Sequence, residues 1–205
     1  LKFLGVDNIR ALRGDPMKNE SSFVPVDGGN EFAIDLIQQI DEMNNGQYLY
    51  EETKNSPSNF CIGAAGYPEK HFEAMNLASD LRHLKAKVDA GAEFIVTQLF
   101  YDNKKYFSFV KKCREIGITV PIIPGLKPIT NQRHLTFIPK FFNTNFPEEF
   151  SNELEKCKTN EEIKKVGIEW SIEQSKELID AGVPVLHFYT MGKGQSVKEV
   201  ASNIF

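Results

Sequence analysis

Residues 61–102 contain the pattern that most limits how this chain can fold, CIGAAGYPEKHFEAMNLASDLRHLKAKVDAGAEFIVTQLFYD. A short apolar run at residues 61–66 is followed by a long amphipathic segment, and a second apolar run occupies residues 94–100. Short runs rich in Ile, Val, Phe and Ala, separated by a helical pattern, are typical of parallel strands that are buried on both faces. The segment therefore predicts a strand, a helix and a second, parallel strand.

The amphipathic segment has two distinct sides when it is read at about 100° per residue. Its apolar side consists of Leu77, Leu81, Leu84 and Val88. A second row, about 90° away at that period, consists of Asp80, His83 and Lys87. Two interpretations of this row stay open. It is either a solvated rim beside a packed helix face or a set of ligand-binding groups that border the buried face.

Three junctions along the chain repeat one arrangement. At Gly91, Gly117 and Gly182 a helical pattern stops at a glycine and a buried strand follows within a few residues. Strands are expected at residues 8–12, 61–66, 94–100, 121–126 and 185–190. Further helices are expected at residues 32–43, 103–116, 130–142, 146–158, 159–182 and 196–205. Repeated βα units predict an α/β fold, either part of an eight-stranded (β/α)8 TIM barrel or a smaller open sheet.

The composition fits one globular domain over residues 1–205, with 41% hydrophobic and 25% charged residues. A formal net charge of -4 argues against nucleic acid or an anionic membrane as the main partner. No apolar run approaches the roughly 20 residues that cross a bilayer. The three cysteines, Cys61, Cys113 and Cys157, are scattered and indicate free thiols in a reducing compartment. We therefore expect a cytoplasmic protein.

Polar residues follow each expected strand, and if the strands are parallel these residues meet at one rim of the sheet. They are Arg13, Asp15, Tyr67, His71, Gln98, Tyr101, Asp102, Lys127, His187, Tyr189 and Lys193. The set has no Ser-His-Asp arrangement, no metal-type spacing and no glycine-rich dinucleotide fingerprint, so acyl transfer and metal hydrolysis rank low and no metal is expected. Aromatic rings, an amide and a carboxylate suit a planar heterocycle bound by stacking and hydrogen bonds. The alternative for residues 13–16 is a plain turn.

Six motifs, in order along the chain, carry a resemblance to a known family. They are Leu12-Arg13-Gly14-Asp15-Pro16, residues 64–71 around Tyr67-Pro68-Glu69, residues 87–92 (KVDAGA), residues 97–102 (TQLFYD), Ile123-Pro124-Gly125 and His187-Phe188-Tyr189-Thr190. Over nearly its whole length the chain resembles methylenetetrahydrofolate reductase of the short, bacterial type. That family is a flavoprotein with a (β/α)8 barrel, in which FAD passes a hydride from NADH or NADPH to 5,10-methylenetetrahydrofolate and gives 5-methyltetrahydrofolate. The resemblance implies FAD as cofactor, a reduced nicotinamide as co-substrate and a folate as substrate, in the one-carbon metabolism that serves methionine biosynthesis.

The resemblance also implies roles for individual residues. Asp15 matches a catalytic acid beside the flavin and the pterin, where its negative charge is expected to stabilise a cationic iminium form of the folate. The positions that match FAD contacts are Arg13, Gly14, Asp15, Ala33, Tyr67, His71, Ala74, Asp80, His83 and Lys87. Gln98 matches the amide that binds the pterin, and Lys193 stands at a substrate contact where the family often has arginine. His83 occupies a position where an amide is also found.

The chain departs from the family in one important way. The family's first three strands, including a glutamate that serves as general acid, have no counterpart. The chain is therefore expected to supply strands 4 to 8 of the barrel, to bind FAD poorly by itself and to turn over nothing alone. The family also implies a homo-oligomer. Two other functions stay open, namely a Schiff-base aldolase that uses Lys127 or Lys193, and a non-catalytic flavin-binding module.

Overall fold

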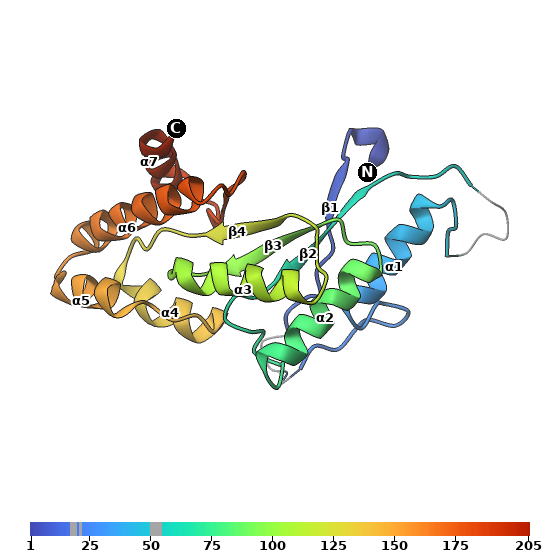
Figure 1. Cartoon of the computed structure of the whole chain (residues 1–205), viewed down its shortest axis with the longest axis horizontal. Coiled ribbons are helices and arrows are strands. Elements are labelled where there is room, and N and C mark those ends of the chain that lie inside the picture. Colours follow the sequence, from blue (N-terminus) through green and yellow to red (C-terminus); the bar gives the residue numbers. More distant parts are fainter. Residues whose placement is uncertain (17–19, 21, 50–54) are drawn as a thin grey trace.

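The computed structural model describes residues 1–16, 20, 22–49 and 55–205. Five parallel strands form one curled sheet in the order β1-β2-β3-β4-β5 (Figure 1). Their bounds are Asn8–Arg10 (β1), Cys61–Gly66 (β2), Phe94–Leu99 (β3), Ile122–Leu126 (β4) and His187–Phe188 (β5). The predicted parallel α/β fold is confirmed, and the sheet is consistent with part of a (β/α)8 barrel.

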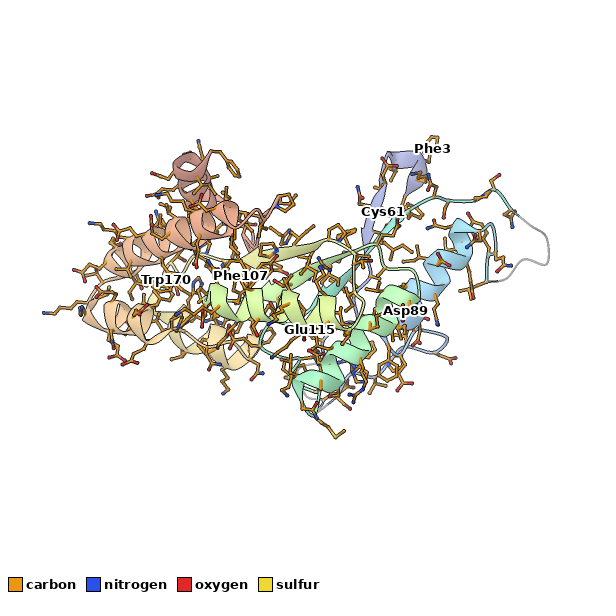
Figure 2. All side chains as sticks on the ribbon, viewed as in Figure 1. Phe3, Cys61, Asp89, Phe107, Glu115 and Trp170 are labelled. Carbon is orange, nitrogen blue, oxygen red and sulfur yellow. The ribbon has the colours of Figure 1, made fainter. Side chains whose placement is uncertain are left out.

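The helices cover one face of the sheet and one end of the molecule (Figure 1). Their bounds are Ala33–Asn44 (α1), Leu77–Asp89 (α2), Asn103–Glu115 (α3), Gln132–Phe142 (α4), Glu148–Lys156 (α5), Asn160–Asp180 (α6) and Gln195–Ile204 (α7), with a 3-10 turn at Lys2–Leu4 (η1). Cys61 at the start of β2 lies toward the same end as Asp89 and Glu115, the last residues of α2 and α3, so these helices run antiparallel to the strands (Figure 2). Within the described ranges no helix combines the length and the apolar content that a bilayer crossing requires.

Local sequence signals fix where these helices begin and end. The predicted capping box of α6 is present, because the Thr159 hydroxyl accepts a hydrogen bond from the backbone N–H of Glu162 at 3.2 Å. Gly91, Gly117 and Gly182 have φ angles of 117°, 81° and 83°, in the left-handed region that favours glycine. The three predicted helix stops are therefore confirmed.

The last strand is shorter than the predicted span of residues 185–190. The backbone N–H of Val183 donates back to the end of α6, and Pro184 has no N–H to donate to a neighbouring strand. Pairing with β4 therefore begins only at His187. One further bond continues the ladder beyond β5, from the N–H of Tyr189 to the carbonyl of Leu126 at 2.8 Å.

The two faces of the sheet have different surroundings. Ile9 and Ala11 belong to an apolar cluster with side chains of α1, and the corresponding side of β3 packs against α2 and α3. Side chains alternate along a strand, so Arg10 lies on the opposite face, and the same alternation places Val96 and Gln98 there. The helix side of the sheet thus holds the apolar core, whereas the other face carries a guanidinium and an amide.

Candidate functional site

A cavity of about 520 Å³ lies at the carboxyl ends of β1 and β2, between the start of α1 and one side of α2. Ligands of parallel α/β proteins bind at this end of the sheet, and the volume is typical of a small-molecule site. The lining includes every residue that the resemblance assigns to FAD, namely Arg13, Gly14, Asp15, Ala33, Tyr67, His71, Ala74, Asp80, His83 and Lys87. We call this space the β1–β2 cavity.

An ion pair crosses the β1–β2 cavity wall. The Nη2 atom of Arg13 lies 2.5 Å from Oε2 of Glu73, and the guanidinium stands 5.5 Å from the ring centroid of Phe23. His71 Nδ1 lies 3.8 Å from the same Glu73 oxygen. The carboxylate of Glu73 therefore holds the positive charge of Arg13 beside the imidazole at the cavity wall.

The loop between β2 and α2 forms a second wall and is tied to the first turn of α2. The backbone N–H of His71 donates to Oδ2 of Asp80 at 2.9 Å, and the His71 ring meets the Tyr67 ring edge-on at a centroid distance of 4.6 Å. Asn76 caps α2 by accepting from the N–H of Ser79 at 2.9 Å. These bonds fix the two aromatic rings relative to the helix that carries the ionisable row.

The same loop is anchored on its outer side by Glu69, whose side chain is only 8% exposed. Its carboxylate pairs with the Lys105 ammonium of α3 and accepts hydrogen bonds from the Thr144 hydroxyl at 2.9 Å and from the side-chain amide of Asn145 at 2.8 Å. A buried carboxylate needs such donors to offset its lost hydration. Glu69 therefore links the loop to α3 and to the connection between α4 and α5.

The ionisable row of α2 faces the β1–β2 cavity, while Leu81 and Leu84 on the adjacent side are buried in the core. Lys87 Nζ donates to the Ala65 carbonyl at 3.3 Å. Burial lowers the pKa of the Lys87 ammonium, and the nearby Asp80 carboxylate partly opposes that shift. The row is therefore part of a cavity wall and not a fully solvated rim.

Burial also shifts the two aromatic groups of the wall. It raises the pKa of the Tyr67 hydroxyl to about 12, with the Asp80 carboxylate acting in the same direction. Burial lowers the pKa of the His71 imidazole, against the opposing influence of Glu73. Both groups are neutral at physiological pH, so the wall offers a hydroxyl donor and an uncharged imidazole.

A second cavity, of about 450 Å³, lies between the end of β4, the start of α4 and the start of α7. Lys127, His134, Lys164, Tyr189 and Lys193 line it, together with small and polar residues. Burial lowers the pKa of the Lys127 ammonium, and burial together with the charges of Lys127 and Arg133 lowers the pKa of His134 to about 4. We call this space the α4–α7 cavity, and its lining contains cations but no carboxylate among the described residues.

Of the three residues assigned to the substrate, Asp15 lines the β1–β2 cavity and the other two lie outside it. Lys193 lines the α4–α7 cavity, and Gln98 lines neither of the two. The Gln98 side-chain oxygen instead accepts from the N–H of Leu99 at 2.9 Å. The expectation that Asp15, Tyr67, His71 and Gln98 share one pocket is therefore met by the first three residues only.

Some lining residues were missed at the sequence level. Phe32, Phe72 and Glu73 line the β1–β2 cavity but were not singled out. Phe32 is the residue before α1, and the other two are neighbours of His71 in a loop, where neither strand nor helix periodicity marks a direction. The one sequence signal for a site role of Phe72 and Glu73 is that they closely follow His71. Among residues with described positions, no group of three His, Cys, Asp or Glu side chains could hold a metal ion.

Fold and site together define a parallel α/β protein of barrel type, with a small-molecule cavity at the carboxyl ends of its strands. The model of one family, methylenetetrahydrofolate reductase, matches residues 1–204. The chain belongs to the methylenetetrahydrofolate reductase family.

Individual relatives agree with this assignment. The chain is 39% identical over 214 aligned residues to methylenetetrahydrofolate reductase (NADH) 1 of Zea mays, an alignment that covers 100% of this chain and 34% of the relative. It is 34% identical to 5,10-methylenetetrahydrofolate reductase of Salmonella typhimurium, over 93% of this chain and 58% of the relative. The chain thus spans about a third of its plant relative and somewhat over half of its bacterial one.

A solved structure of a Clostridium thermocellum protein is a more distant match. That protein is described as binding two copies of 5-methyl-5,6,7,8-tetrahydrofolic acid. It is 18% identical with a TM-score of 0.48, and the match covers 71% of this chain and 53% of that one. Similarity at this level is too low to support an argument about fold or function.

Proposed function

We propose that this chain forms the flavin-binding part of a reductase that converts 5,10-methylenetetrahydrofolate to 5-methyltetrahydrofolate, with FAD as cofactor and NADH or NADPH as electron donor. Family membership supports this reaction. The reaction is proposed for a polypeptide of the relatives' length that contains this chain. In it, the five strands β1 to β5 correspond to strands 4 to 8 of a (β/α)8 barrel, and the general acid of the folate step comes from strands 1 to 3.

The observation that carries the proposal is the meeting, in one cavity, of the ten residues that the resemblance assigns to FAD. They come from residues 13–15, from the start of α1 and from residues 67–87, and the structure gathers all ten at the ends of two neighbouring strands. Residues so far apart in sequence line one cavity because β1 and β2 are neighbouring strands and because α2 turns its ionisable row toward their carboxyl ends. Both features are expected from the family resemblance. This grouping supports a dinucleotide site in the β1–β2 cavity.

The donor set of the cavity fits FAD. Lys87 and Arg13 supply positive charge for a pyrophosphate, and Tyr67 and His71 supply ring surfaces for a flat heterocycle. The small side chain of Ala74, which is 8% exposed, leaves room for close approach at the wall. Different parts of the same lining therefore match the pyrophosphate and the flat rings of FAD.

Bound FAD would supply the hydride transfer between nicotinamide and folate. The chain's own residues bind and orient. Tyr67 remains a hydroxyl donor at physiological pH because its pKa is about 12. Asp15 lies at the exposed part of the cavity, where its carboxylate stabilises positive charge that develops on the folate. Lys193 and the buried Lys127 place positive charge in the α4–α7 cavity for the carboxylates of the folate tail.

Absorption spectroscopy tests the proposed function directly. The full-length protein should be yellow as purified, should lose its visible flavin absorbance under anaerobic NADH or NADPH, and should regain it on addition of 5,10-methylenetetrahydrofolate. A colourless preparation that cannot be reconstituted with FAD contradicts the proposal. Comparing NADH with NADPH in the same assay decides the donor, which differs among relatives named for NADH and for NADPH.

Substitution Asp15→Asn tests the assigned catalytic role. The folate step should slow by about 10-fold or more, while reduction of the flavin by the nicotinamide should change little, because the charge stabilises a cation only in the folate step. Stopped-flow measurement of the two half-reactions separates these effects. Equal losses in both steps would mean that Asp15 supports structure alone.

One observation favours a second candidate function, the Schiff-base aldolase. Lys127 is 6% exposed, and burial lowers its pKa, as in lysines that form imines. Borohydride trapping of a ketoacid on Lys127 would support that reading, and absence of trapping by a protein that binds FAD would exclude it. For the reductase we further propose a homo-oligomer in the cytoplasm, which size-exclusion chromatography and cell fractionation test.

A further inference from the structure

A chain of hydrogen bonds crosses the sheet on the face opposite the helices. The Tyr189 hydroxyl donates to the backbone carbonyl of Thr97 at 2.8 Å, and Nη2 of Arg10 donates to the same hydroxyl at 3.2 Å. The Arg10 guanidinium also lies 5.8 Å from the centroid of the Tyr189 ring. These contacts join β1, β3 and the residue that follows β5, at a separation of up to 179 residues along the chain.

The Thr97 carbonyl belongs to an irregular part of the sheet. The pairing of β3 with β4 shifts register between Val96 and Leu99, and the Thr97 hydroxyl accepts the N–H of Gly125 at 2.9 Å. A β-carbon on Gly125 would lie 2.3 Å from the Thr97 carbonyl oxygen and 2.6 Å from the Tyr189 ring. The absence of a side chain at Gly125 thus allows the tyrosine to reach the irregular stretch.

Gln98 is, with Thr97, one of the two residues inside this irregular stretch. Its neighbours Thr97 and Leu99 are 0% and 2% exposed, while Gln98 itself is half-buried on the opposite face. Its side-chain oxygen accepts from the N–H of Leu99 at 2.9 Å. An irregularity of this kind changes the direction of a side chain relative to a regular strand, and such irregularities are common beside active sites.

Apart from Tyr189, few groups offset the positive charge of Arg10. Its Nε atom is buried without a hydrogen-bond partner in the described part of the chain, and no carboxylate of that part lies within 4.0 Å of it. The Tyr189 hydroxyl and ring therefore supply a hydrogen bond and a cation–π contact to the Arg10 guanidinium. A cation that donates to a hydroxyl oxygen strengthens that hydroxyl as a donor in turn, here toward Thr97.

We propose that Tyr189 is a positioning residue, which fixes the β3 irregularity through Thr97 and so sets the direction of Gln98 for recognition of the pterin, with Arg10 orienting the hydroxyl. This inference rests on the proposed function, because the family resemblance assigns Gln98 to the pterin of the folate substrate. Tyr189 acts through the backbone of Thr97 and does not line the β1–β2 cavity. It does line the α4–α7 cavity, so its coupling to Gln98 separates the positioning role from a direct contact with the folate tail.

The test compares Tyr189→Phe with Tyr106→Phe in the full-length enzyme. The Tyr106 hydroxyl also donates to a strand carbonyl, that of Ile122 at 2.7 Å, but on the helix side of the sheet. Each variant loses one hydrogen bond to a strand carbonyl, and Tyr189→Phe also loses the bond from Arg10. Only Tyr189→Phe should lower kcat/KM for the folate, by about 10-fold, which corresponds to about 1.4 kcal/mol. FAD affinity and flavin reduction by the nicotinamide should stay within about 2-fold of wild type in both.

The measurement that decides the inference is the energetic coupling between Tyr189 and Gln98, obtained by combining substitutions at both residues. In a Gln98→Ala background, Tyr189→Phe should lower folate kcat/KM by no more than about 2-fold, because the group it positions is gone. A full further 10-fold loss in that background would overturn the inference, and so would an unchanged kcat/KM for Tyr189→Phe alone. If instead the wild type binds no FAD, the proposed function fails, which is a different result.

A ligand-free measurement keeps the inference testable in either case. Hydrogen exchange at the Leu99 amide, followed by NMR on the full-length protein without ligands, should speed up in Tyr189→Phe and not in Tyr106→Phe. Equal exchange in both variants contradicts the positioning role whatever the reaction is. If Tyr189→Phe does not fold, Arg10→Met should give a smaller rise in the same exchange rate, and no rise there also contradicts it.

Discussion

Lys87→Met should separate the affinity for FAD from the stability of the fold. Lys87 lies in the β1–β2 cavity on α2, with its ammonium bonded to the Ala65 carbonyl at 3.3 Å. No carboxylate of the described residues lies within 4.0 Å of it, and burial lowers its pKa. The ammonium is thus held in a partly desolvated place without a close counter-charge, which a phosphate would provide.

The size of the effect follows from that arrangement. A hydrogen bond between charged groups contributes about 1.5–3 kcal/mol, so its loss should raise the dissociation constant for FAD by about 10-fold to 150-fold. Methionine keeps most of the apolar length of the side chain and removes the desolvated charge. The unfolding temperature without FAD should therefore stay level or rise, while the affinity falls.

Quenching of flavin fluorescence on titration of FAD into the apoprotein measures the affinity, and differential scanning fluorimetry measures the unfolding temperature. Lys85→Met is the matched control, because Lys85 lies on the same helix, pairs with Asp89 and does not line the cavity. An unchanged FAD affinity in Lys87→Met, or an equal loss in Lys85→Met, would refute the reasoning.

Three further predictions concern stability and its dependence on pH. Gly167→Ala should destabilise the protein by about 2–4 kcal/mol despite the better helix propensity of alanine, because the new β-carbon would lie 2.0 Å from the carbonyl oxygen of Ile129. Urea denaturation should show this loss. The control is Gly194→Ala, where the β-carbon enters open space and stability should change by less than about 1 kcal/mol. The pKa of His134 in the folded protein is about 4, below the ordinary histidine value of 6.5. Between these two values the unfolded state binds one more proton, so stability falls as pH drops through that window. His134→Gln should flatten this fall by about 1–2 kcal/mol, a figure reduced for solvent screening, and parallel curves for the two proteins would contradict it. Glu69→Ala should cost about 3 kcal/mol and weaken FAD binding, since four donors lose one buried acceptor, and an unchanged unfolding midpoint would show that Glu69 anchors nothing.

The ends of helices and strands were predictable where the cause is local. Gly91 and Gly182 stop helices because their φ angles suit glycine, and the Thr159 capping box depends on residues three apart. The last strand was predicted too long, because its apolar pattern contains no sign that Pro184 and the preceding helix end delay the pairing. A strand needs a partner, and a partner is not a local property.

The residues of the candidate site also divide into those that the sequence predicts and those that it does not. The row Asp80, His83 and Lys87 could be read from helical periodicity, and the resemblance supplied the remaining positions of the β1–β2 cavity. Glu73, by contrast, stands in a loop without periodicity, and its contact with Arg13 spans 60 residues. Nothing in the order of the residues indicates such a contact.

By itself the sequence determined the succession of parallel strands and helices, the glycine stops and the separation of the ionisable row of α2 from its apolar side. These depend on backbone preference and on side-chain spacing within about ten residues, which any stretch of chain carries with it. Only the tertiary structure decided that Lys193 lies in a separate cavity and that Tyr189 joins Arg10 to Thr97. Those outcomes depend on how the curled sheet brings its first and last strands within reach of each other, and that distance is set by the packing of the whole sheet.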